Sequence, residues 1–362
     1  MKNSPLASKH LNMNAKVADF GGWLMPIEYP QSGVIAEYSS VRERVGIFDV
    51  SHLGKISVKG DGALVFLNQM VTNDLNRITD GQAQYTLLCN ENGGVVDDLI
   101  IYRNSDTDFF LVPNAANTAS VFEILKAEAT TNLIIENLHE KFAVIALQGP
   151  KSFELLNSIG IDTNIDYMQF LKTEIGGVKV ILCRTGYTGE LGFEIIPAWS
   201  EAGKVWDILV ENVNKFNGLV CGLGARDLLR TEMGYPLHGH ELSLDISPVE
   251  AAAGWAVGWS KEVFRGRTTL LNQKEKGTKL KLKALLSIGR GIPRKDMQVK
   301  NVAGEVIGYV TSGTFSPSLK KGIGLALINS DSKKGDKVLI DIRGLDAEFE
   351  VVQLPLVPSK VK

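Results

Sequence analysis

The stretch QYTLLCNENGGVVDDLIIY, residues 84–102, indicates what kind of sheet organises the first part of this chain. Apolar and polar residues alternate along residues 84–90, as they do in β-strands. The ENGG tetrad at 91–94 is typical of a hairpin turn, and the apolar run at 95–102 follows it as a second strand. Strands joined by so short a turn run antiparallel, so we expect an antiparallel sheet.

Two adjacent carboxylates, Asp97 and Asp98, lie inside the second of these strands. Burying a charge costs free energy unless the charge is paired or used. Side chains alternate along a strand, so Asp98 shares a face with Tyr102 while Asp97 points to the other face. A carboxylate and a phenol on one wall can flank a planar ligand. The alternative is that both aspartates cap the turn or face water, because acidic residues often border turns.

Strands and helices mix on either side of this hairpin. We expect strands at residues 55–60 and 109–112, and a helix at 118–129 with Asn114 or Asn117 at its N-cap. From about residue 143 the pattern begins again. The second series comprises a strand at 143–150, a helix at 151–160, two strands within 179–196, and helices at 204–213 and 225–234.

The composition changes in the last quarter of the chain. Residues 274–283, KEKGTKLKLK, are polar and basic and are predicted to form a linker. After them come only short strand-like runs separated by glycine and proline, which indicates a small antiparallel barrel or sandwich. We therefore expect an α+β fold. Residues 1–262 would hold two interleaved α+β subdomains with antiparallel sheets, and residues 280–362 an all-β, barrel-like domain.

The bulk composition excludes several classes of function. The 362 residues carry a formal net charge of −2, so no overall basic field recruits nucleic acid or an anionic membrane. No apolar run approaches the ~18 residues that span a membrane, and no apolar region follows the N-terminal lysines. Cys89, Cys183 and Cys221 are far apart and flanked by apolar residues, which suits buried thiols in a reducing cytosol. We expect a cytoplasmic protein.

A glycine-rich segment, RTGYTGELGFE at 184–194, lacks the Gly-Lys-Ser/Thr ending of a phosphate-binding loop, and no GxGxxG dinucleotide motif occurs. Its last residue, Glu194, stands between Phe193 and Ile195 in a predicted strand. A buried glutamate can accept two parallel N–H bonds from an aminopyrimidinone edge such as that of a pterin. A salt bridge to a nearby arginine is the alternative.

The segment GLGARDLLRTE, residues 222–232, opens a helix on which Arg226 and Arg230 share a face. Asp227 reaches Arg230 at a spacing of three residues, and this pattern usually indicates structural ion pairs. An arginine beside a glycine-lined turn can equally donate to a ligand carbonyl or carboxylate.

The histidines give little support to metal or covalent chemistry. His238 and His240 alternate, but no third histidine or cysteine lies near them and PLHGHEL is typical of a turn, so we expect no metal site. His52, in DVSHLG, is interpreted as a structural histidine rather than a base. No GxSxG nucleophile motif occurs.

Taken together, these segments resemble the T-protein family, the aminomethyltransferases of the glycine cleavage system. The resemblance runs nearly end to end, and its motifs are highly specific in this order. They are DFGGWLMP (19–26), VGIFDVSH (45–52), NENGGVVDD (90–98), RTGYTGE (184–190), GLGARD (222–227) and TSGTFSP (311–317).

The resemblance implies a three-domain cloverleaf with tetrahydrofolate in its central opening. The aminomethyl group on the lipoyl arm of a partner, the H-protein, would yield 5,10-methylenetetrahydrofolate, ammonia and the dihydrolipoyl arm. Tetrahydrofolate is then a co-substrate, and no metal, pyridoxal phosphate or nucleotide is required. Asp98 matches the family's catalytic aspartate. The matches to folate contacts are Tyr187, Glu194 and Arg226, with Tyr102, Asn114 and Tyr235 lining the same pocket.

Two positions depart from the family's pattern. Leu53 stands where the family usually has methionine, an apolar exchange in a pocket wall. The family has a C-terminal arginine that meets the folate's glutamate tail, and Lys360 is the nearest candidate for that role here. A lysine ammonium is a compact single charge and cannot offer a carboxylate the two parallel N–H donors of an arginine. The basic residues at 274–283, with Lys320 and Lys321, can attract an acidic carrier protein or simply form a solvated surface.

Three other functions are compatible with such a chain. A folate-binding relative that assists iron–sulfur assembly usually carries a KGCYxGQE-type motif, whereas residues 264–267 read FRGR here. A folate-dependent demethylase on the same scaffold would act on a small methylated amine or sulfonium compound. A non-catalytic folate-binding module would use Asp98 only to hold the pterin.

Overall fold

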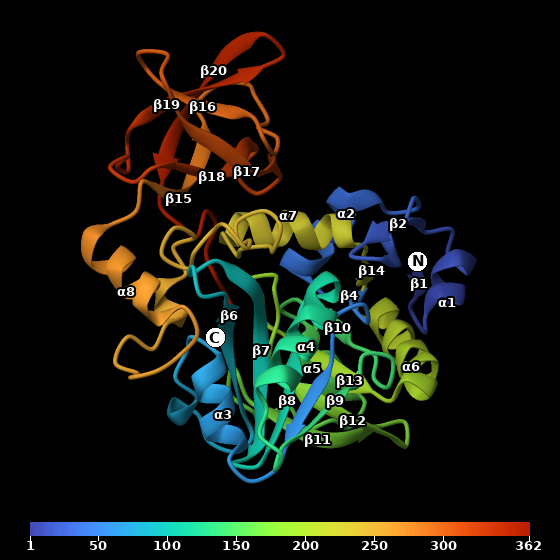
Figure 1. Ribbon diagram of the computed structural model, residues 1–362. Coiled ribbons are helices and arrows are strands. Elements are labelled where there is room, and N and C mark those ends of the chain that lie inside the picture. Colours follow the sequence, from blue (N-terminus) through green and yellow to red (C-terminus); the bar gives the residue numbers. More distant parts are fainter.

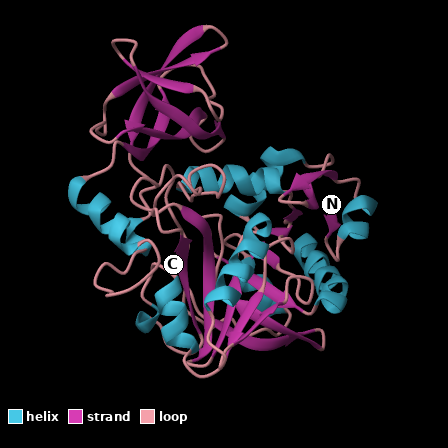
Figure 2. Ribbon diagram, in the orientation of Figure 1, coloured by secondary structure: helices cyan, strands magenta, loops and turns pink.

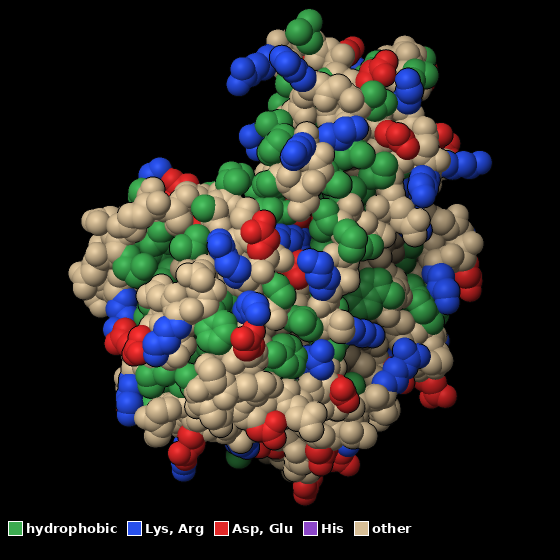
Figure 3. Space-filling view, turned by 180° about the vertical axis from the view of Figure 1, so that it is seen from behind, with side chains coloured by type: hydrophobic (Ala, Val, Ile, Leu, Met, Phe, Trp, Pro, Cys, Tyr) green, Lys and Arg blue, Asp and Glu red, His purple; other side chains and the backbone are tan.

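The computed structural model describes residues 1–362 and shows an α+β body with a β-barrel at one end (Figure 1, Figure 2). The expected α+β fold, with antiparallel sheets and a C-terminal barrel, is confirmed. On the face shown in Figure 3, basic and acidic side chains are interspersed over both the body and the barrel. The three cysteines are free and buried, as predicted. No helix is both long and apolar enough to cross a membrane.

The predicted hairpin forms one side of a five-stranded sheet in the body. The strands, in the order β6-β7-β8-β5-β9, are β5 (Ile56–Lys59), β6 (Gln82–Cys89), β7 (Val95–Ser105), β8 (Asp108–Val112) and β9 (Ile134–Asn137). Every pairing in this sheet is antiparallel. Helices α3 (Ala63–Met70) and α4 (Thr118–Glu128) pack against it, with Val121 and Leu125 of α4 buried in their shared core.

A six-stranded sheet forms the second half of the body. Its strands, in the order β11-β12-β13-β10-β4-β14, are β4 (Gly46–Asp49), β10 (Ile145–Gln148), β11 (Phe170–Ile175), β12 (Val178–Cys183), β13 (Gly192–Pro197) and β14 (Leu219–Val220). Helices α5 (Ser152–Ser158) and α6 (Ala202–Lys215) pack on its core, into which α6 inserts Trp206. A second core contains both Phe48 of this sheet and Tyr102 of the hairpin sheet, so the two sheets meet there.

Helix α7 (Leu223–Met233) lies on the side of the body that faces the barrel (Figure 1). It stops at Gly234, whose φ of 71° is a left-handed conformation that glycine adopts without a Cβ clash. The other elements are β1 (Lys2–Asn3), α1 (Ala7–Asn12), β2 (Lys16–Phe20), β3 (Trp23–Glu28), α2 (Gly33–Glu43), α8 (Arg267–Lys276) and 3-10 turns at Leu75–Arg77, Ala115–Asn117, Trp199–Glu201 and Gly254–Ala256. Strands β1, β3 and β2 form a small sheet of their own.

The C-terminal barrel is closed by antiparallel strands. They are β15 (Leu280–Ser287), β16 (Gln298–Asn301), β17 (Val306–Ser316), β18 (Lys321–Asn329), β19 (Lys337–Ile342) and β20 (Leu345–Val352). Val310, Ile340 and Phe349 are among the side chains that fill its core. Strand β17 also contacts α7, so the barrel rests on the helix that begins at the glycine-rich turn of the body.

The last residues of the chain leave the barrel and return to the body. The Leu356 N–H donates to the carbonyl oxygen of Glu232, near the end of α7, at 2.8 Å. The Lys360 N–H donates to the carbonyl oxygen of Gly189, also at 2.8 Å. The C-terminus consequently lies in the body, away from the barrel that precedes it (Figure 1).

Two expectations are wrong, each because of a tertiary contact. Residues 274–283 do not form a linker, since α8 and β15 occupy most of this stretch and Leu270 anchors α8 in a buried core. Neither Asn114 nor Asn117 caps α4 with its side chain. Both side-chain amides donate instead to the buried carboxylate of Asp97.

Candidate functional site

A cavity of about 210 Å³ lies in the body where both sheets, helix α7 and the turn after it meet. Apolar and aromatic side chains make up most of its walls, as is typical of a small-molecule site. The predicted site residues that line it are Leu53, Asp98, Asn114, Tyr187, Glu194, Arg226 and Tyr235. The other two, Tyr102 and Lys360, lie outside the lining.

Strand β7 brings Asp98 to the cavity and turns Asp97 away from it, as side-chain alternation predicts. Asp97 is fully buried and accepts hydrogen bonds from the amides of Asn114 (2.9 Å) and Asn117 (2.7 Å). Asp98 Oδ1 accepts from Asn114 Nδ2 at 2.8 Å, and its Oδ2 accepts from the Tyr85 hydroxyl at 3.1 Å. One asparagine therefore orients both carboxylates, and neither acid serves as a cap of the turn.

The surroundings of Asp98 shift its protonation equilibrium toward the neutral form. Burial raises the pKa of Asp98 above its usual range, and the Tyr85 hydrogen bond, the nearby His238 and the Asn114 hydrogen bond act in the opposite direction. Burial, followed by repulsion from Asp98, also raises the pKa of Asp97. A carboxyl group with a raised pKa in a cavity is suited to exchange a proton and to stabilise a cation brought next to it.

Strand β13 supplies a second carboxylate, Glu194, which is 9% exposed. Its Oε2 accepts a hydrogen bond from Thr185 Oγ1 at 2.6 Å, and it forms no salt bridge with an arginine. The buried Tyr102 hydroxyl lies 3.3 Å from Thr185 Oγ1. Since Thr185 gives its only hydroxyl proton to Glu194, Tyr102 is the donor in that second contact. Tyr102 therefore helps to position Glu194 indirectly, by hydrogen bonding to Thr185, and does not line the cavity.

Arg226, on α7, lines the cavity without a partner in the protein. Its guanidinium lies 4.8 Å from the centre of the Tyr187 ring. It donates no hydrogen bond, and its Nη1 is buried and unpartnered. Burial lowers the pKa of Arg226. Because buried donors without acceptors are rare, this guanidinium marks a place where a ligand can supply an acceptor.

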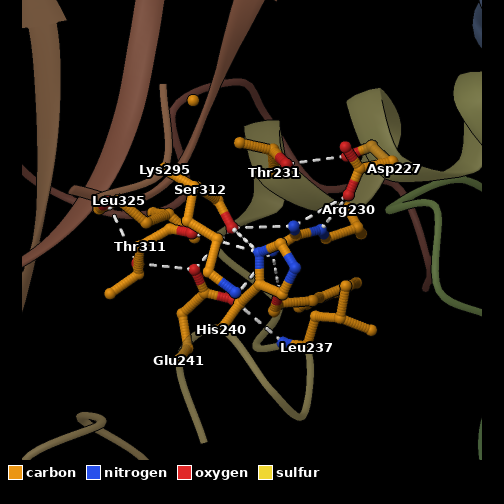
Figure 4. A network of polar contacts seen from close by, with 12 residues as sticks. Asp227, Arg230, Thr231, Leu237, His240, Glu241, Lys295, Thr311, Ser312 and Leu325 are labelled. Atoms are coloured by element: carbon orange, nitrogen blue, oxygen red, sulfur yellow. Dashed lines mark hydrogen bonds and ion pairs between the residues drawn. The ribbon is translucent and has the colours of Figure 1, made fainter. Parts of the chain in front are cut away.

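Arg230, one turn further along α7, is fully paired (Figure 4). Its Nη2 donates to Asp227 Oδ1 and to Ser312 Oγ, each at 2.8 Å, and its Nη1 donates to Glu241 Oε2 at 2.9 Å. Thr311, beside Ser312 on β17, donates to the other oxygen of Glu241 at 2.6 Å. The predicted Asp227–Arg230 pair is therefore confirmed. We call Asp227, Arg230, Glu241 and Ser312 the α7–barrel cluster, because it joins that helix to the barrel.

Four aromatic side chains line the cavity but were not predicted, namely Phe20, Tyr85, Tyr167 and Trp255. Tyr85 pairs with Ile100 in the hairpin register, on the same face as Asp98, so the predicted hairpin contained a signal for it. Trp255 stacks on Tyr85 with ring centroids 5.1 Å apart and planes at 23°. Nothing in the local sequence around Trp255 or Tyr167 indicates that they reach this hairpin.

Tyr187 and Tyr235 form another aromatic part of the wall. Their ring centroids are 5.7 Å apart, and the Tyr187 hydroxyl donates to the carbonyl oxygen of Pro236. Lys360 lies elsewhere, with its ammonium 3.5 Å from Glu190 Oε1 and its side chain 56% exposed.

The paired histidines form the turn that the sequence predicts. His238 Nε2 contacts the carbonyl oxygen of Val95 at 3.0 Å, and His240 Nδ1 that of Thr311 at 3.1 Å. The chain brings together no group of three or more histidine, cysteine, aspartate or glutamate side chains that could hold a metal ion. His52, which the sequence suggests is structural, lines the cavity.

Comparisons with known proteins agree on one family. Residues 6–261 match the family model described as the GCVT N-terminal domain, and residues 281–358 match the glycine cleavage T-protein C-terminal barrel domain. Aminomethyltransferases of Parafrankia sp. (strain EAN1pec) and Mycobacterium tuberculosis (strain ATCC 25618 / H37Rv) are 53% and 52% identical, covering 99% of this chain and 98% of each relative. The crystal structure of glycine cleavage system aminomethyltransferase T from Bartonella henselae is 32% identical, covers 99% of both chains and superimposes with a TM-score of 0.93.

Proposed function

This chain belongs to the glycine cleavage T-protein family, the aminomethyltransferases of the glycine cleavage system, and we propose that its one-carbon acceptor is tetrahydrofolate. The donor is the aminomethyl group that a partner, the H-protein, carries on its lipoyl arm. The products are 5,10-methylenetetrahydrofolate, ammonia and the dihydrolipoyl arm. The reaction takes place in the cytosol and requires neither a metal nor pyridoxal phosphate. Residues 1–262 form the folate-binding region in this proposal, and residues 280–362 the barrel domain.

The donors and acceptors of the cavity suit a reduced pterin. Glu194 has acceptor lone pairs for the N–H groups of an aminopyrimidinone edge. Arg226 has donors that lack an acceptor, and these suit the carbonyl oxygen of the same ring. Tyr187, Tyr235 and Leu53 supply flat or apolar surface for the body of the ligand.

The observation that carries the proposal is the Asp98 carboxylate, half-buried in the cavity and held by Asn114 and Tyr85. As ammonia leaves, positive charge develops on the carbon–nitrogen fragment, and the attacking nitrogen must lose a proton. Tetrahydrofolate supplies the nitrogens that finally hold the carbon. Asp98 in its charged form stabilises the cationic fragment and accepts or orients that proton. The apolar walls exclude water, which strengthens this electrostatic attraction.

Two residues outside the lining have supporting roles. Tyr102 holds Glu194 in place through Thr185. Lys360 is our candidate for the glutamate tail of the folate, because its side chain is half exposed and its ammonium, 3.5 Å from Glu190 Oε1, can also meet a flexible carboxylate from solvent.

Ammonia release from aminomethylated H-protein, measured with and without tetrahydrofolate, tests the proposal. We expect release that depends on tetrahydrofolate and is matched by an equal amount of 5,10-methylenetetrahydrofolate. Release that is the same without tetrahydrofolate would contradict the proposal. A folate-dependent demethylase would instead consume a small methylated amine or sulfonium compound and leave the carrier unchanged. A non-catalytic folate-binding protein would bind tetrahydrofolate and release nothing.

A further inference from the structure

His52 is a polar side chain of the cavity that has no partner in the protein. It follows β4, lines the same cavity as Asp98 and Arg226, and is only 3% exposed. Neither nitrogen of its ring makes a hydrogen bond, and Nδ1 is buried and unpartnered. Nε2 is not fully buried and has no protein partner, so it is open to a hydrogen bond with whatever fills the cavity.

One contact packs against the ring of His52, and another fixes its backbone. The Phe20 ring stands edge-on to it, with centroids 5.2 Å apart and planes at 80°. The carbonyl oxygen of His52 accepts a hydrogen bond from His139 Nε2 at 2.8 Å. Since Nδ1 is closed off, Nε2 is the nitrogen that a ligand in the cavity can reach. The ring therefore presents a single nitrogen to the cavity in a defined direction.

The surroundings of His52 keep it neutral. Burial lowers the pKa of His52 to about 3; Asp49 opposes this shift, while Arg226, Lys55 and His139 add to it. A neutral imidazole has one N–H donor and one acceptor nitrogen. It therefore adds a hydrogen bond beside the ligand without adding a second positive charge, which would oppose the cationic fragment that the proposed reaction creates.

We propose that His52 binds the folate co-substrate by donating from Nε2 to the carbonyl side of the pterin ring, next to Arg226. This inference rests on the proposed function, because it takes the pterin as the occupant of the cavity. An aminopyrimidinone ring has N–H donors on one edge and a carbonyl oxygen beside them, so a complete site needs both acceptors and donors. Glu194 supplies the acceptors, and Arg226 and His52 supply the donors.

Two substitutions separate this hydrogen bond from the packing of the ring. His52→Gln places a donor nitrogen near the position of Nε2, whereas His52→Leu fills the space without a polar atom. Both proteins and the unaltered one are titrated with tetrahydrofolate in a calorimeter. We expect His52→Leu to raise the dissociation constant about tenfold, the usual value of one net hydrogen bond, and His52→Gln to stay within about threefold. Equal dissociation constants for His52→Leu and the unaltered protein, or equal losses in both variants, would overturn the inference.

The result also separates this inference from the proposed function. If the unaltered protein does not bind tetrahydrofolate, the proposed function is wrong; if it binds and His52→Leu binds equally well, only the role of His52 is wrong. Should the variants not fold, nitrogen NMR of the unaltered protein decides. Tetrahydrofolate should shift the ring nitrogen signals of His52 and leave unchanged those of His10 and His139, which lie outside the cavity lining. An unshifted His52 signal would overturn the inference.

Discussion

Arg226 and Arg230 lie one turn apart on α7 and both border the cavity, but they differ in their hydrogen-bond partners. Arg230 is 1% exposed and donates to Asp227, Glu241 and Ser312, so that it joins the helix to the barrel. Arg226 faces the cavity and donates to no protein atom. The comparison separates two kinds of buried charge: one whose partners belong to the fold, and one whose partner has to come from a ligand.

The two aspartates of β7 are both hydrogen-bonded within the protein, but they differ in their access to the cavity. Asp97 is fully buried and satisfied by Asn114 and Asn117, whereas Asp98 is half-buried and faces the cavity. A buried charge is costly unless it is paired, and removing one partner of a buried pair leaves the other charge uncompensated. Substitutions in the α7–barrel cluster should therefore lower stability. Substitutions in the cavity should lower turnover or binding and leave stability unchanged.

Replacing Asp98 tests the cavity side of this comparison and has the largest expected effect. Asp98→Asn keeps the shape of the side chain and removes its charge, so turnover should fall about 10²–10⁴-fold, the usual contribution of a general acid–base group. Folate binding should persist, and the free energy of unfolding should not fall, because burial already disfavours the charged form. Single-turnover ammonia release and folate titration measure the two effects. Turnover within a few-fold of the unaltered protein would remove Asp98 from the mechanism.

Replacing Arg230 tests the other side. Arg230→Met leaves the fully buried Glu241 without its counter-charge, so the free energy of unfolding should fall by about 3–5 kcal/mol. Urea unfolding measures this loss. The double variant Arg230→Met/Glu241→Gln is the control and should recover part of it, because the uncompensated charge is gone. A loss below about 1 kcal/mol would mean that the cluster does not stabilise the fold.

The same substitution at Arg226 should act on binding. Arg226→Met should raise the dissociation constant for tetrahydrofolate about 10- to 150-fold, since hydrogen bonds to charged groups contribute roughly 1.5–3 kcal/mol. Its free energy of unfolding should stay the same or increase, because an unpaired buried charge is removed. Calorimetric titration and urea unfolding, run beside Arg230→Met, give the matched comparison. Equal losses of stability at both positions would break the distinction between the two arginines.

The smallest expected effect concerns Tyr102, which reaches the ligand only through other side chains. Tyr102→Phe removes the hydroxyl behind Thr185, so the KM for tetrahydrofolate should rise about 2- to 10-fold with kcat unchanged. Thr185→Val should raise KM further, because it removes the direct donor to Glu194, and Thr185→Ser should retain most of the affinity. A lower kcat at unchanged KM in Tyr102→Phe would instead place that phenol at the reacting atoms.

Local regularities were sufficient to predict the hairpin and the separation of its two acids. The period of a strand is set by its backbone, so assigning Asp97 and Asp98 to opposite faces needs no tertiary information. The two arginines could not be separated in this way. The partners that distinguish Arg230 are Glu241 and Ser312, which lie 11 and 82 residues further along the chain, and helical spacing carries no information about them.

The expectations that failed also concern contacts between distant segments. Asn114 and Asn117 have the chemistry of N-caps, but the buried Asp97 carboxylate takes both of their amides. Trp255 reaches Tyr85 from the separate 3-10 turn Gly254–Ala256, so no local pattern could place it in the cavity. Contacts between polar and aromatic groups from distant segments thus determined which side chains reach the cavity and which partners they have. The periodicity of the sequence does not determine these features.

The anchored end of the chain determines where a foreign segment can be attached. The Lys360 N–H donates to the carbonyl oxygen of Gly189, two residues from Tyr187. An affinity tag fused after Lys362 would therefore disturb the loop that places Tyr187 in the cavity wall. Met1, in contrast, is 80% exposed. A tag before Met1 should leave folate affinity intact, whereas the same tag at the other end should weaken it without altering any cavity residue.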